Sequence, residues 1–286
     1  MSDQPTRETR NEVFGAGGGP QAAIPRRNVM KDDFGFEIPV ESVPLPSAGR
    51  TYPSDSPLYG QETIEIRAMT AKDEDILTSR TLIKKGTVIT ELLRSCIVDK
   101  RIDPDNMLSG DRNAVMTAIR VTGYGGEYSV EVDCPACGER SKQGFMLTDL
   151  AIKRLDINPV AEGSNLFECK LPITKKTVRY KFLTGRDETE ITVASERRKK
   201  QGMQADNLVT AKLMYAIKQV DNIDDKNKIQ HFVRNMPARD SLTLRRHMDD
   251  NEPGIDMKSW MDCPHCLESS EVRLPMGANF FWPDTE

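Results

Sequence analysis

The sequence predicts an α+β fold, with a core built on two cysteine-bearing hairpins, an inserted helical subdomain and an extended N-terminal arm. Three observations support this prediction. Two related Cys-x-x-Cys pairs each lie between strand-like segments, amphipathic helical segments separate the pairs, and the first 60 residues contain no sustained helical period. The chain has 286 residues, 37% of them hydrophobic, which is enough apolar material for one large core or two modest ones.

Residues 1–60 are predicted to form the extended, partly disordered arm, because they are rich in glycine and proline. Phe34, Phe36 and Ile38 alternate with other residues, so this piece is expected to lie as an extended strand on another surface. A flexible tail is the alternative for the first 30 residues.

Residues 61–183 are predicted to form the α+β core with the first cysteine hairpin. A period-two strand over 62–67 precedes a helix that Thr70 caps and that ends at Gly86. Further helices are expected over about 87–98 and 111–121. A hairpin is predicted from 167–171 and 178–182, joined by the turn at Lys175 and Lys176.

Residues 184–256 are predicted to form the helical subdomain, and residues 257–286 the second cysteine hairpin and an aromatic tail that complete the core. The predicted helices cover about 184–200 and 208–220, a segment around 229–233, and 242–248. The helices lie between the two halves of the cysteine pattern. They are therefore expected to form a subdomain that leaves the core and returns to it.

The two cysteine pairs, Cys134 with Cys137 and Cys263 with Cys266, share the pattern Asp-Cys-Pro-x-Cys. Strand-like alternation flanks each pair, which places the cysteines at the tips of two hairpins, or knuckles. One Cys-x-x-Cys turn supplies two of the four sulfur ligands that a structural zinc site needs. The sequence therefore predicts one Zn²⁺ per chain, bound by all four cysteines.

Other interpretations of the pairs are a redox centre, two half-sites that a neighbouring chain completes, or coincidence. A redox Cys-x-x-Cys normally begins a helix, whereas these pairs lie between strands. His265 stands inside the second turn, where simultaneous coordination would be strained, so we expect it to face solvent. Cys96 and Cys169 lie in apolar patterns and are predicted to be small buried hydrophobic residues.

Composition and motifs argue against several functions. The chain lacks a phosphate-binding loop, a His-Glu-x-x-His motif and a nucleophile elbow, and a four-cysteine shell leaves no open metal position, so no enzyme activity is expected. No apolar stretch is long enough for a membrane span. With a formal net charge of −4, the chain is not expected to bind nucleic acid, and the basic run 197–200 is interpreted as a solvated helix end.

Several ordered motifs resemble a known family. They are Pro-Leu-Pro-Ser-Ala-Gly-Arg at 44–50, the segment 66–75, Gly-Asp-Arg-Asn at 110–113, the two Cys-Pro-x-Cys turns, and Phe-Phe-Trp-Pro at 280–283. Together they are similar to the baseplate proteins of T-even-type phages that are associated with the central hub. The resemblance runs from about Ile38 to the C-terminus.

The resemblance implies a structural or assembly role in the baseplate of a contractile phage tail. It implies other baseplate and hub proteins as partners, no small-molecule substrate, and assembly in the host bacterial cytoplasm. It leaves open whether the protein stays in the virion tail or acts only during assembly. A zinc-knuckle regulator that binds nucleic acid is the competing function.

Contact with partners is predicted at both ends of the chain. The arm contributes Phe34, Phe36 and Ile38, and the tail contributes Phe280, Phe281 and Trp282. Aromatic residues near chain ends have little local core to enter, so another surface is a natural place for them. The alternative for the tail is that Phe281 and Trp282 fold back beneath the second knuckle.

Overall fold

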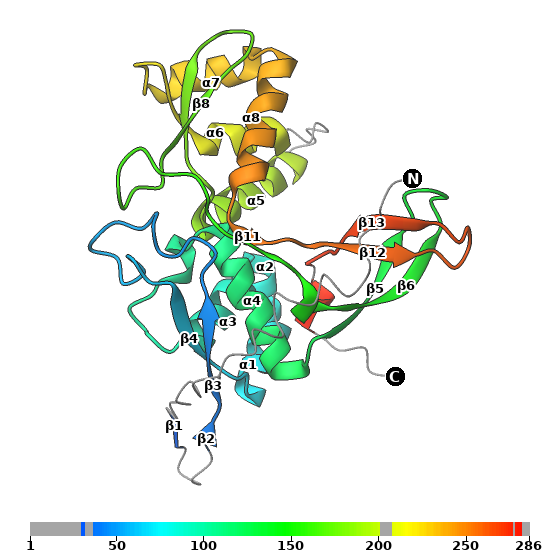
Figure 1. Ribbon diagram of the computed structural model, residues 1–286. Helices are drawn as coiled ribbons and strands as arrows, with labels where there is room; N and C mark the ends of the chain where they lie inside the picture. The colour runs from blue at the N-terminus through cyan, green and yellow to red at the C-terminus, as the bar shows by residue number, and fades with distance from the viewer. Residues whose placement is uncertain (1–29, 32–36, 201–207, 277, 282–286) are drawn as a thin grey trace, which may run out of the picture.

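The computed structural model describes residues 30–31, 37–200, 208–276 and 278–281, and it has an α+β fold (Figure 1). Helices and small antiparallel sheets alternate along the chain, which confirms the predicted class. An upper part contains most of the C-terminal helices, and the two cysteine hairpins project together to one side (Figure 1). No helix in the described part of the chain is both long and apolar enough for a membrane span.

The N-terminal part of the core is a two-stranded sheet. β3 (Val40–Pro44) pairs with β4 (Thr63–Arg67), and their inward side chains include Val43 and Ile66. The loop between them is also buried at Leu45, Tyr52 and Leu58, so this part of the predicted arm packs on the core. Before them, β1 (Met30–Lys31) pairs with β2 (Glu37–Ile38).

Three short helices follow β4. They are α1 (Ala71–Thr78), α2 (Arg80–Lys85) and α3 (Val88–Cys96). Thr70 and Asp73 form a capping box at the start of α1, which is the predicted helix start. The helix expected to run to Gly86 is interrupted at Ser79, whose ψ of 106° is extended. Gly86 ends α2 in the left-handed conformation that glycine favours, with φ of 70°.

The central helix of the core is α4 (Ser109–Tyr124), which follows the 3-10 turn η2 (Pro104–Asn106). It buries Val115 and Ile119 along one face, and it begins two residues before the predicted start. Gly110 lies against the backbone of Pro253, and a β-carbon at this glycine would lie 1.7 Å from the Pro253 carbonyl oxygen. This close approach holds the segment that returns from the helical part against α4.

Both cysteine hairpins are regular. The first consists of β5 (Glu127–Asp133) and β6 (Arg140–Met146), and the second of β12 (Lys258–Asp262) and β13 (Ser269–Arg273). After β6 come η3 (Leu147–Asp149) and β7 (Ile152–Lys153), which pairs with β11 (Gly254–Ile255). The short 3-10 helix η4 (Ala278–Phe281) follows the second hairpin.

The upper part combines a three-stranded sheet with four helices. The sheet order is β10-β9-β8, with β8 (Phe167–Lys170), β9 (Thr177–Tyr180) and β10 (Ile217–Val220). The helices are α5 (Gly185–Lys200), α6 (Leu208–Ala216), α7 (Lys226–Asn235) and α8 (Ala238–Asn251). The predicted β8–β9 hairpin is present. The helix predicted over 208–220 ends at Ala216, and the chain continues as the strand β10.

Candidate metal centre

The two knuckles have the same backbone hydrogen bonds. In the first, the amide of Cys134 donates to the carbonyl of Glu139 at 2.9 Å, and the amide of Gly138 donates to the carbonyl of Cys134 at 2.9 Å. In the second, the amide of Cys263 donates to the carbonyl of Glu268 at 3.1 Å, and the amide of Leu267 to the carbonyl of Cys263 at 2.9 Å. The repeated pattern gives two similar Cys-x-x-Cys turns.

The four sulfur atoms meet where the hairpin tips face each other. The Sγ atoms of Cys134 and Cys266 lie 3.8 Å apart, and those of Cys137 and Cys263 lie 3.7 Å apart. All four ligand atoms lie within 4.8 Å of one another. Zn–S bonds of about 2.3 Å in a tetrahedron separate the sulfurs by roughly 3.8 Å, so the cluster has the dimensions of a four-sulfur zinc shell.

The thiols affect one another's protonation. Backbone amides of Cys137 and Ala136 donate to the Cys134 sulfur, and they lower the pKa of this thiol to about 7 despite some desolvation. At Cys137 the amide of Glu139 favours the thiolate, but desolvation and the neighbouring sulfurs outweigh it and raise the pKa. The pKa of Cys266 is also raised. Without a cation, four adjacent sulfurs cannot all ionise easily, whereas a bound metal favours the thiolates.

Position, and not burial, separates these four cysteines from the other two. Cys134 and Cys263 are buried, while Cys137 and Cys266 are exposed at the hairpin tips. His265 is exposed and is not a member of the cluster, in line with its expected position in solvent. Cys96 and Cys169 are buried away from the cluster, and desolvation raises the pKa of Cys96 to about 12.

Contacts outside the sulfurs also join the hairpins. The side-chain amide of Gln143 donates to the carbonyl of Asp262 at 3.3 Å, and the hydroxyl of Tyr128 donates to the carbonyl of Pro275 at 2.7 Å. Inward side chains of both hairpins belong to the same hydrophobic cluster, among them Val132, Phe145, Met261 and Val272. The sulfur cluster therefore lies at the end of a packed interface.

Residues 49–166 match the model of the family described as T4 bacteriophage base plate protein. This segment belongs to the T4-type baseplate family. The resemblance to T4-type baseplate proteins is thereby confirmed over these residues, and the match supports a structural protein of the baseplate. The searches of curated proteins and of solved structures each found no match to the chain.

The matched baseplate segment contains only the first knuckle, with Cys134 and Cys137. The second knuckle, with Cys263 and Cys266, lies 126 or more positions further along the chain from its sulfur partners. The candidate metal centre therefore joins the family segment to a part of the chain outside it.

Two of the motifs that carried the family resemblance form buried polar networks, of which sequence reasoning predicted only the helix cap at Thr70. The carboxylate of Asp111 accepts from the Ser47 amide at 3.0 Å, from the Ser47 hydroxyl at 2.6 Å and from the Tyr52 hydroxyl at 2.6 Å. The carboxylate of Asp73 accepts two hydrogen bonds from Arg67, at 2.7 and 2.9 Å. These networks hold the β3–β4 loop on α4 and fix the start of α1, so both motifs have structural roles.

The tail departs from its predicted role at two residues. Phe280 and Phe281 are 0% and 1% exposed, and the Phe280 ring contacts the ring of Tyr128 edge-on at 5.3 Å between centroids. Both rings lie in the core of the chain, so in this structure they are not exposed contact residues. Phe280 contacts Tyr128 of the first hairpin, whereas the alternative placed Phe281 and Trp282 beneath the second knuckle. The core was available to Phe280 and Phe281 because η4 packs against α4, a contact between residues far apart in sequence.

The remaining predicted contact residues are Trp282, Phe34, Phe36 and Ile38, and only Ile38 is among the described residues. Trp282, Phe34 and Phe36 lie outside the described residues. Ile38 is half-buried and pairs with Met30 between β2 and β1. Contact through Ile38 therefore stays a prediction.

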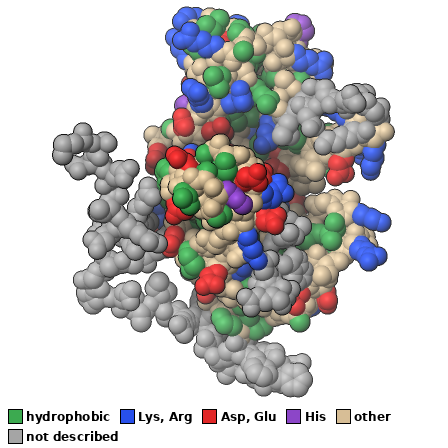
Figure 2. Space-filling model, turned by 90° about the vertical axis from the view of Figure 1, so that its right-hand side faces the viewer, with side chains coloured by type: hydrophobic (Ala, Val, Ile, Leu, Met, Phe, Trp, Pro, Cys, Tyr) green, Lys and Arg blue, Asp and Glu red, His purple; other side chains and the backbone are tan. Residues whose placement is uncertain are grey.

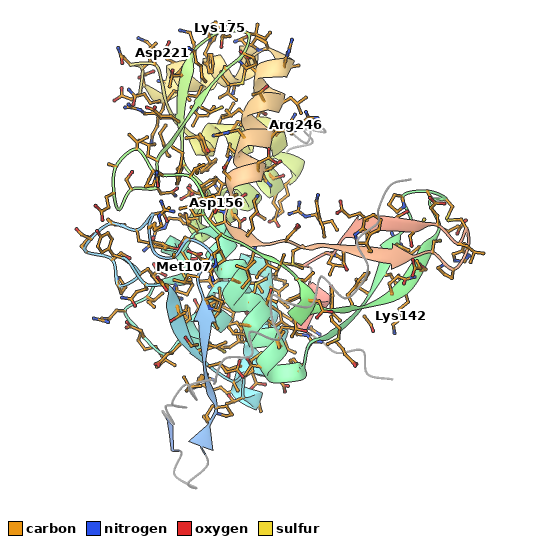
Figure 3. The ribbon with its side chains drawn as sticks, viewed as in Figure 1. Met107, Lys142, Asp156, Lys175, Asp221 and Arg246 are labelled. Atoms are coloured by element: carbon orange, nitrogen blue, oxygen red, sulfur yellow. The ribbon has the colours of Figure 1, made fainter. Side chains whose placement is uncertain are left out.

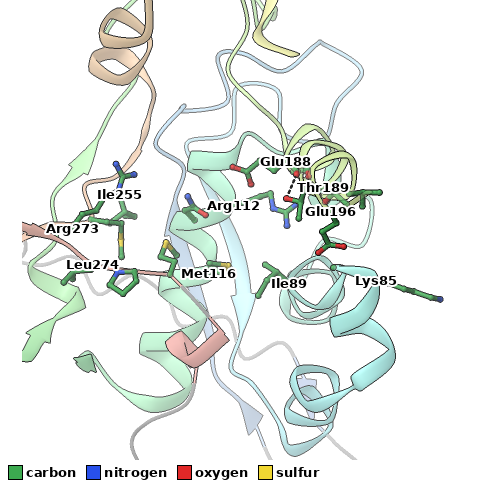
Figure 4. A pocket seen from close by; sticks show the side chains of 18 of the residues that line it. Lys85, Ile89, Arg112, Met116, Glu188, Thr189, Glu196, Ile255, Arg273 and Leu274 are labelled. Carbon is green, nitrogen blue, oxygen red and sulfur yellow. Dashed lines mark hydrogen bonds between the residues drawn. The ribbon is translucent and has the colours of Figure 1, made fainter. Parts of the chain in front are cut away.

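A separate cavity of about 590 Å³ lies between α3, α4, α5 and the segments around β11 and after β13 (Figure 4). Its apolar lining includes Ile89, Met116 and Leu274, and its charged lining includes cationic and acidic residues from several elements. Arg112 reaches the cavity, but its guanidinium is already in contact with the Pro104 carbonyl at 3.3 Å and the Asp105 carboxylate at 3.5 Å. These contacts indicate a structural role for Arg112.

Charge is distributed unevenly over the face that carries the hairpins. Lys and Arg side chains gather over the upper, helical part, while Asp and Glu side chains are prominent around the middle of the view, where the hairpins project (Figure 2). Side chains such as Lys175 and Arg246 extend outward from the upper part, and Lys142 extends from β6 (Figure 3). The hairpin tips and the helical part therefore offer partners surfaces of different charge.

Proposed function

We propose that the chain is a structural or assembly component of the central hub region of a phage baseplate, and that one Zn²⁺ stabilises it. The four-sulfur cluster supports the zinc site most directly. Its sulfur separations of 3.7 and 3.8 Å suit Zn²⁺, and its two halves come from hairpins that share little direct backbone bonding. Zinc would pin the second hairpin to the baseplate segment.

In this proposal the work of the protein is contact with other baseplate and hub proteins. The family match supports a baseplate structural protein. The metal would hold the two hairpins in a fixed position relative to each other. With four cysteine ligands the ion has no open position, so its contribution is structural. The chain would assemble in the host cytoplasm with its baseplate partners.

Elemental analysis of the protein, purified without chelators or metal-affinity resin, tests the zinc site. We expect one zinc per chain in the wild type and in Cys96→Ala, and none in Cys137→Ser or Cys263→Ser. A folded wild type that contains no zinc after purification in zinc-supplemented medium would refute the site.

The assembly role is tested separately, by probing finished particles and baseplate intermediates for the chain. We expect the chain in intermediates, and its presence or absence in finished particles distinguishes a permanent subunit from an assembly factor. Normal baseplates in a phage that lacks the chain would refute the role.

The competing proposal, binding of nucleic acid, has one structural observation in its favour. The α7–α8 hairpin exposes a group of basic side chains, Lys226, Lys228, Arg234, Arg239 and Arg246. Phosphate contacts would make DNA binding fall steeply with salt. We expect the purified protein to bind duplex DNA only weakly at 150 mM salt, and tight, salt-dependent binding would favour this alternative.

A further inference from the structure

The two knuckles carry different residues at one position where the backbone is left-handed. In the first, the residue after the second cysteine is Gly138, with φ of 78°. In the second, the equivalent residue is Leu267, with φ of 62°. Both amides donate to the carbonyl of the first cysteine in their turn, so the left-handed conformation belongs to the turn and Leu267 must adopt it. Bulky residues adopt this conformation rarely, because the β-carbon crowds the following carbonyl.

No interior contact accounts for this leucine. The side chain of Leu267 is 87% exposed at the tip of the second hairpin, the largest exposure among the large hydrophobic side chains described. Single exposed hydrophobic residues are common on protein surfaces. A leucine that is both strained and almost fully exposed gains nothing within the chain from its side chain, and strained positions often mark functional sites.

The second hairpin also carries a further exposed ring, and the first does not. Trp260 on β12 is 55% exposed, because it points to the outer face while its neighbour Met261 is buried. At the tip of the first hairpin the corresponding turn contains Pro135, Ala136 and Gly138, none of which offers a large apolar side chain. The first hairpin exposes Met146, at 44%, at the end of β6 away from the tip, so the apolar side chain exposed at the hairpin tips is Leu267.

Two exposed acidic side chains lie at the hairpin tips beside Leu267. Glu268 follows it directly, and Glu139 occupies the equivalent position in the first knuckle. In the proposed zinc form, four thiolates around one divalent ion add a net charge of about −2. A surface that receives Leu267 should therefore present positive charge around an apolar pocket.

We propose that Leu267 is an anchor residue that inserts into an apolar pocket, rimmed by Lys or Arg side chains, on another protein of the baseplate. The inference rests on the proposed function and deepens it by naming the contact residue and the chemistry of its partner. Within the chain a glycine would fit the turn better, as Gly138 does. Insertion into a pocket accounts for the leucine, because burial of its side chain favours association.

The test uses baseplate intermediates purified from a phage whose own copy of the gene is disabled. Wild-type chain, Leu267→Gly and Leu267→Met are added at increasing concentration, and incorporation is measured. Ile83→Ala is the matched control, because it removes an exposed aliphatic side chain from α2. Melting temperatures of all four proteins are measured first.

We expect Leu267→Gly to melt at the wild-type temperature or above it, because glycine relieves the backbone strain. Its half-maximal incorporation should nevertheless need about tenfold to hundredfold more protein, the loss that removal of one buried leucine predicts. Leu267→Met and Ile83→Ala should incorporate as the wild type does. Higher salt should weaken wild-type incorporation, because the acidic tip meets a basic rim.

Wild-type incorporation of Leu267→Gly would overturn the inference and leave the proposed function standing. Failure of the wild-type chain itself to incorporate, together with normal baseplates in its absence, would instead remove the proposed function. A concentration-dependent dimer of the wild type that Leu267→Gly abolishes would overturn the inference by assigning the tip to a second copy of the chain.

Discussion

The guanidinium of Arg120 donates from Nε to the carbonyl oxygen of Phe280 at 2.9 Å, although the two residues lie 160 positions apart. Its other two nitrogens donate to the carbonyls of Gly125 at 2.7 Å and Glu127 at 2.9 Å. One buried side chain on α4 therefore holds the end of its own helix, the start of β5 and the C-terminal η4. The tail is part of the core through this contact.

Arg120→Met should lower the free energy of unfolding by about 3 kcal/mol, because three carbonyls lose a charged donor and methionine replaces only the bulk of the side chain. Urea unfolding at pH 7 measures the change. Arg140→Met removes an exposed pair with Asp133 and should leave the free energy of unfolding almost unchanged, because water screens this pair. Equal effects of the two variants would contradict the role of Arg120.

The buried tail rings give a second prediction. Phe280→Ala and Phe281→Ala should each lower the free energy of unfolding by about 3 to 5 kcal/mol, since both rings are fully buried. Trp282→Ala tests the remaining contact prediction for the tail, through melting temperature and incorporation into baseplate intermediates. A phenylalanine variant with wild-type stability would show that its ring is not part of the core in solution.

Zinc removal should distinguish the cysteines. A strong chelator should lower the melting temperature of the wild type and of Cys96→Ala, but should have no further effect on Cys263→Ser, which has already lost a ligand. Cys263→Ser should be less stable than Cys96→Ala when zinc is present, because the metal closes a long loop between hairpins. Equal responses of all three proteins to the chelator would contradict a shared site.

The lowered pKa of Asp73 predicts that the stability of the fold depends on pH. Burial opposes its ionisation, but hydrogen bonds from Arg67, Ser95 and Thr70 outweigh burial and lower its pKa below the ordinary value. The folded state therefore holds the proton less tightly than the unfolded state. The resulting stabilisation is fully present above about pH 4 and is lost as the pH falls through the lowered pKa.

Asp73→Asn should accordingly lower the free energy of unfolding by about 2 to 3 kcal/mol at pH 7, and the difference from the wild type should shrink as the pH falls below about 4. Denaturant unfolding at pH 7, 5 and 3 measures it. A difference that stays constant over this range would show that the carboxylate charge does not contribute.

The raised pKa of Glu252 predicts a pH dependence of folding stability with the opposite sign. Burial, with Glu188 and Asp249 nearby, raises the pKa of this carboxyl to about 7. A raised carboxyl pKa favours the folded state below the unfolded value of about 4, and this contribution is lost as the pH rises through 7. Glu252→Gln should therefore raise the free energy of unfolding by about 1 to 2 kcal/mol at pH 8 and change it little at pH 4. Unfolding curves at the two pH values decide this.

The meeting of the four cysteines could be predicted from sequence because its signals are local. Each Cys-x-x-Cys turn follows alternating strand residues, and two half-shells of the same kind are incomplete until they combine. The caps at Thr70 and Gly86 are equally local, and the structure contains both.

Other features depend on contacts that no local pattern encodes. Ile217 and Val220 satisfy a helical pattern, yet they form β10 because β9 offers them the partners Tyr180 and Val178. The loop after β3 has the composition of an arm, yet Asp111, 64 positions away from Ser47, holds it in the core. Arg120 has no sequence signal as a buried residue, because its partners become neighbours only in the fold.

The order of synthesis gives the paired knuckles a further consequence. A growing chain exposes Cys134 and Cys137 long before Cys263 and Cys266 are translated, and until then the first hairpin has two thiols and no opposing pair. A prematurely terminated chain would keep this half-site and would also lack Phe280, the acceptor for Arg120. Only a chain translated through the second knuckle and η4 can form both the four-sulfur cluster and the Arg120–Phe280 contact.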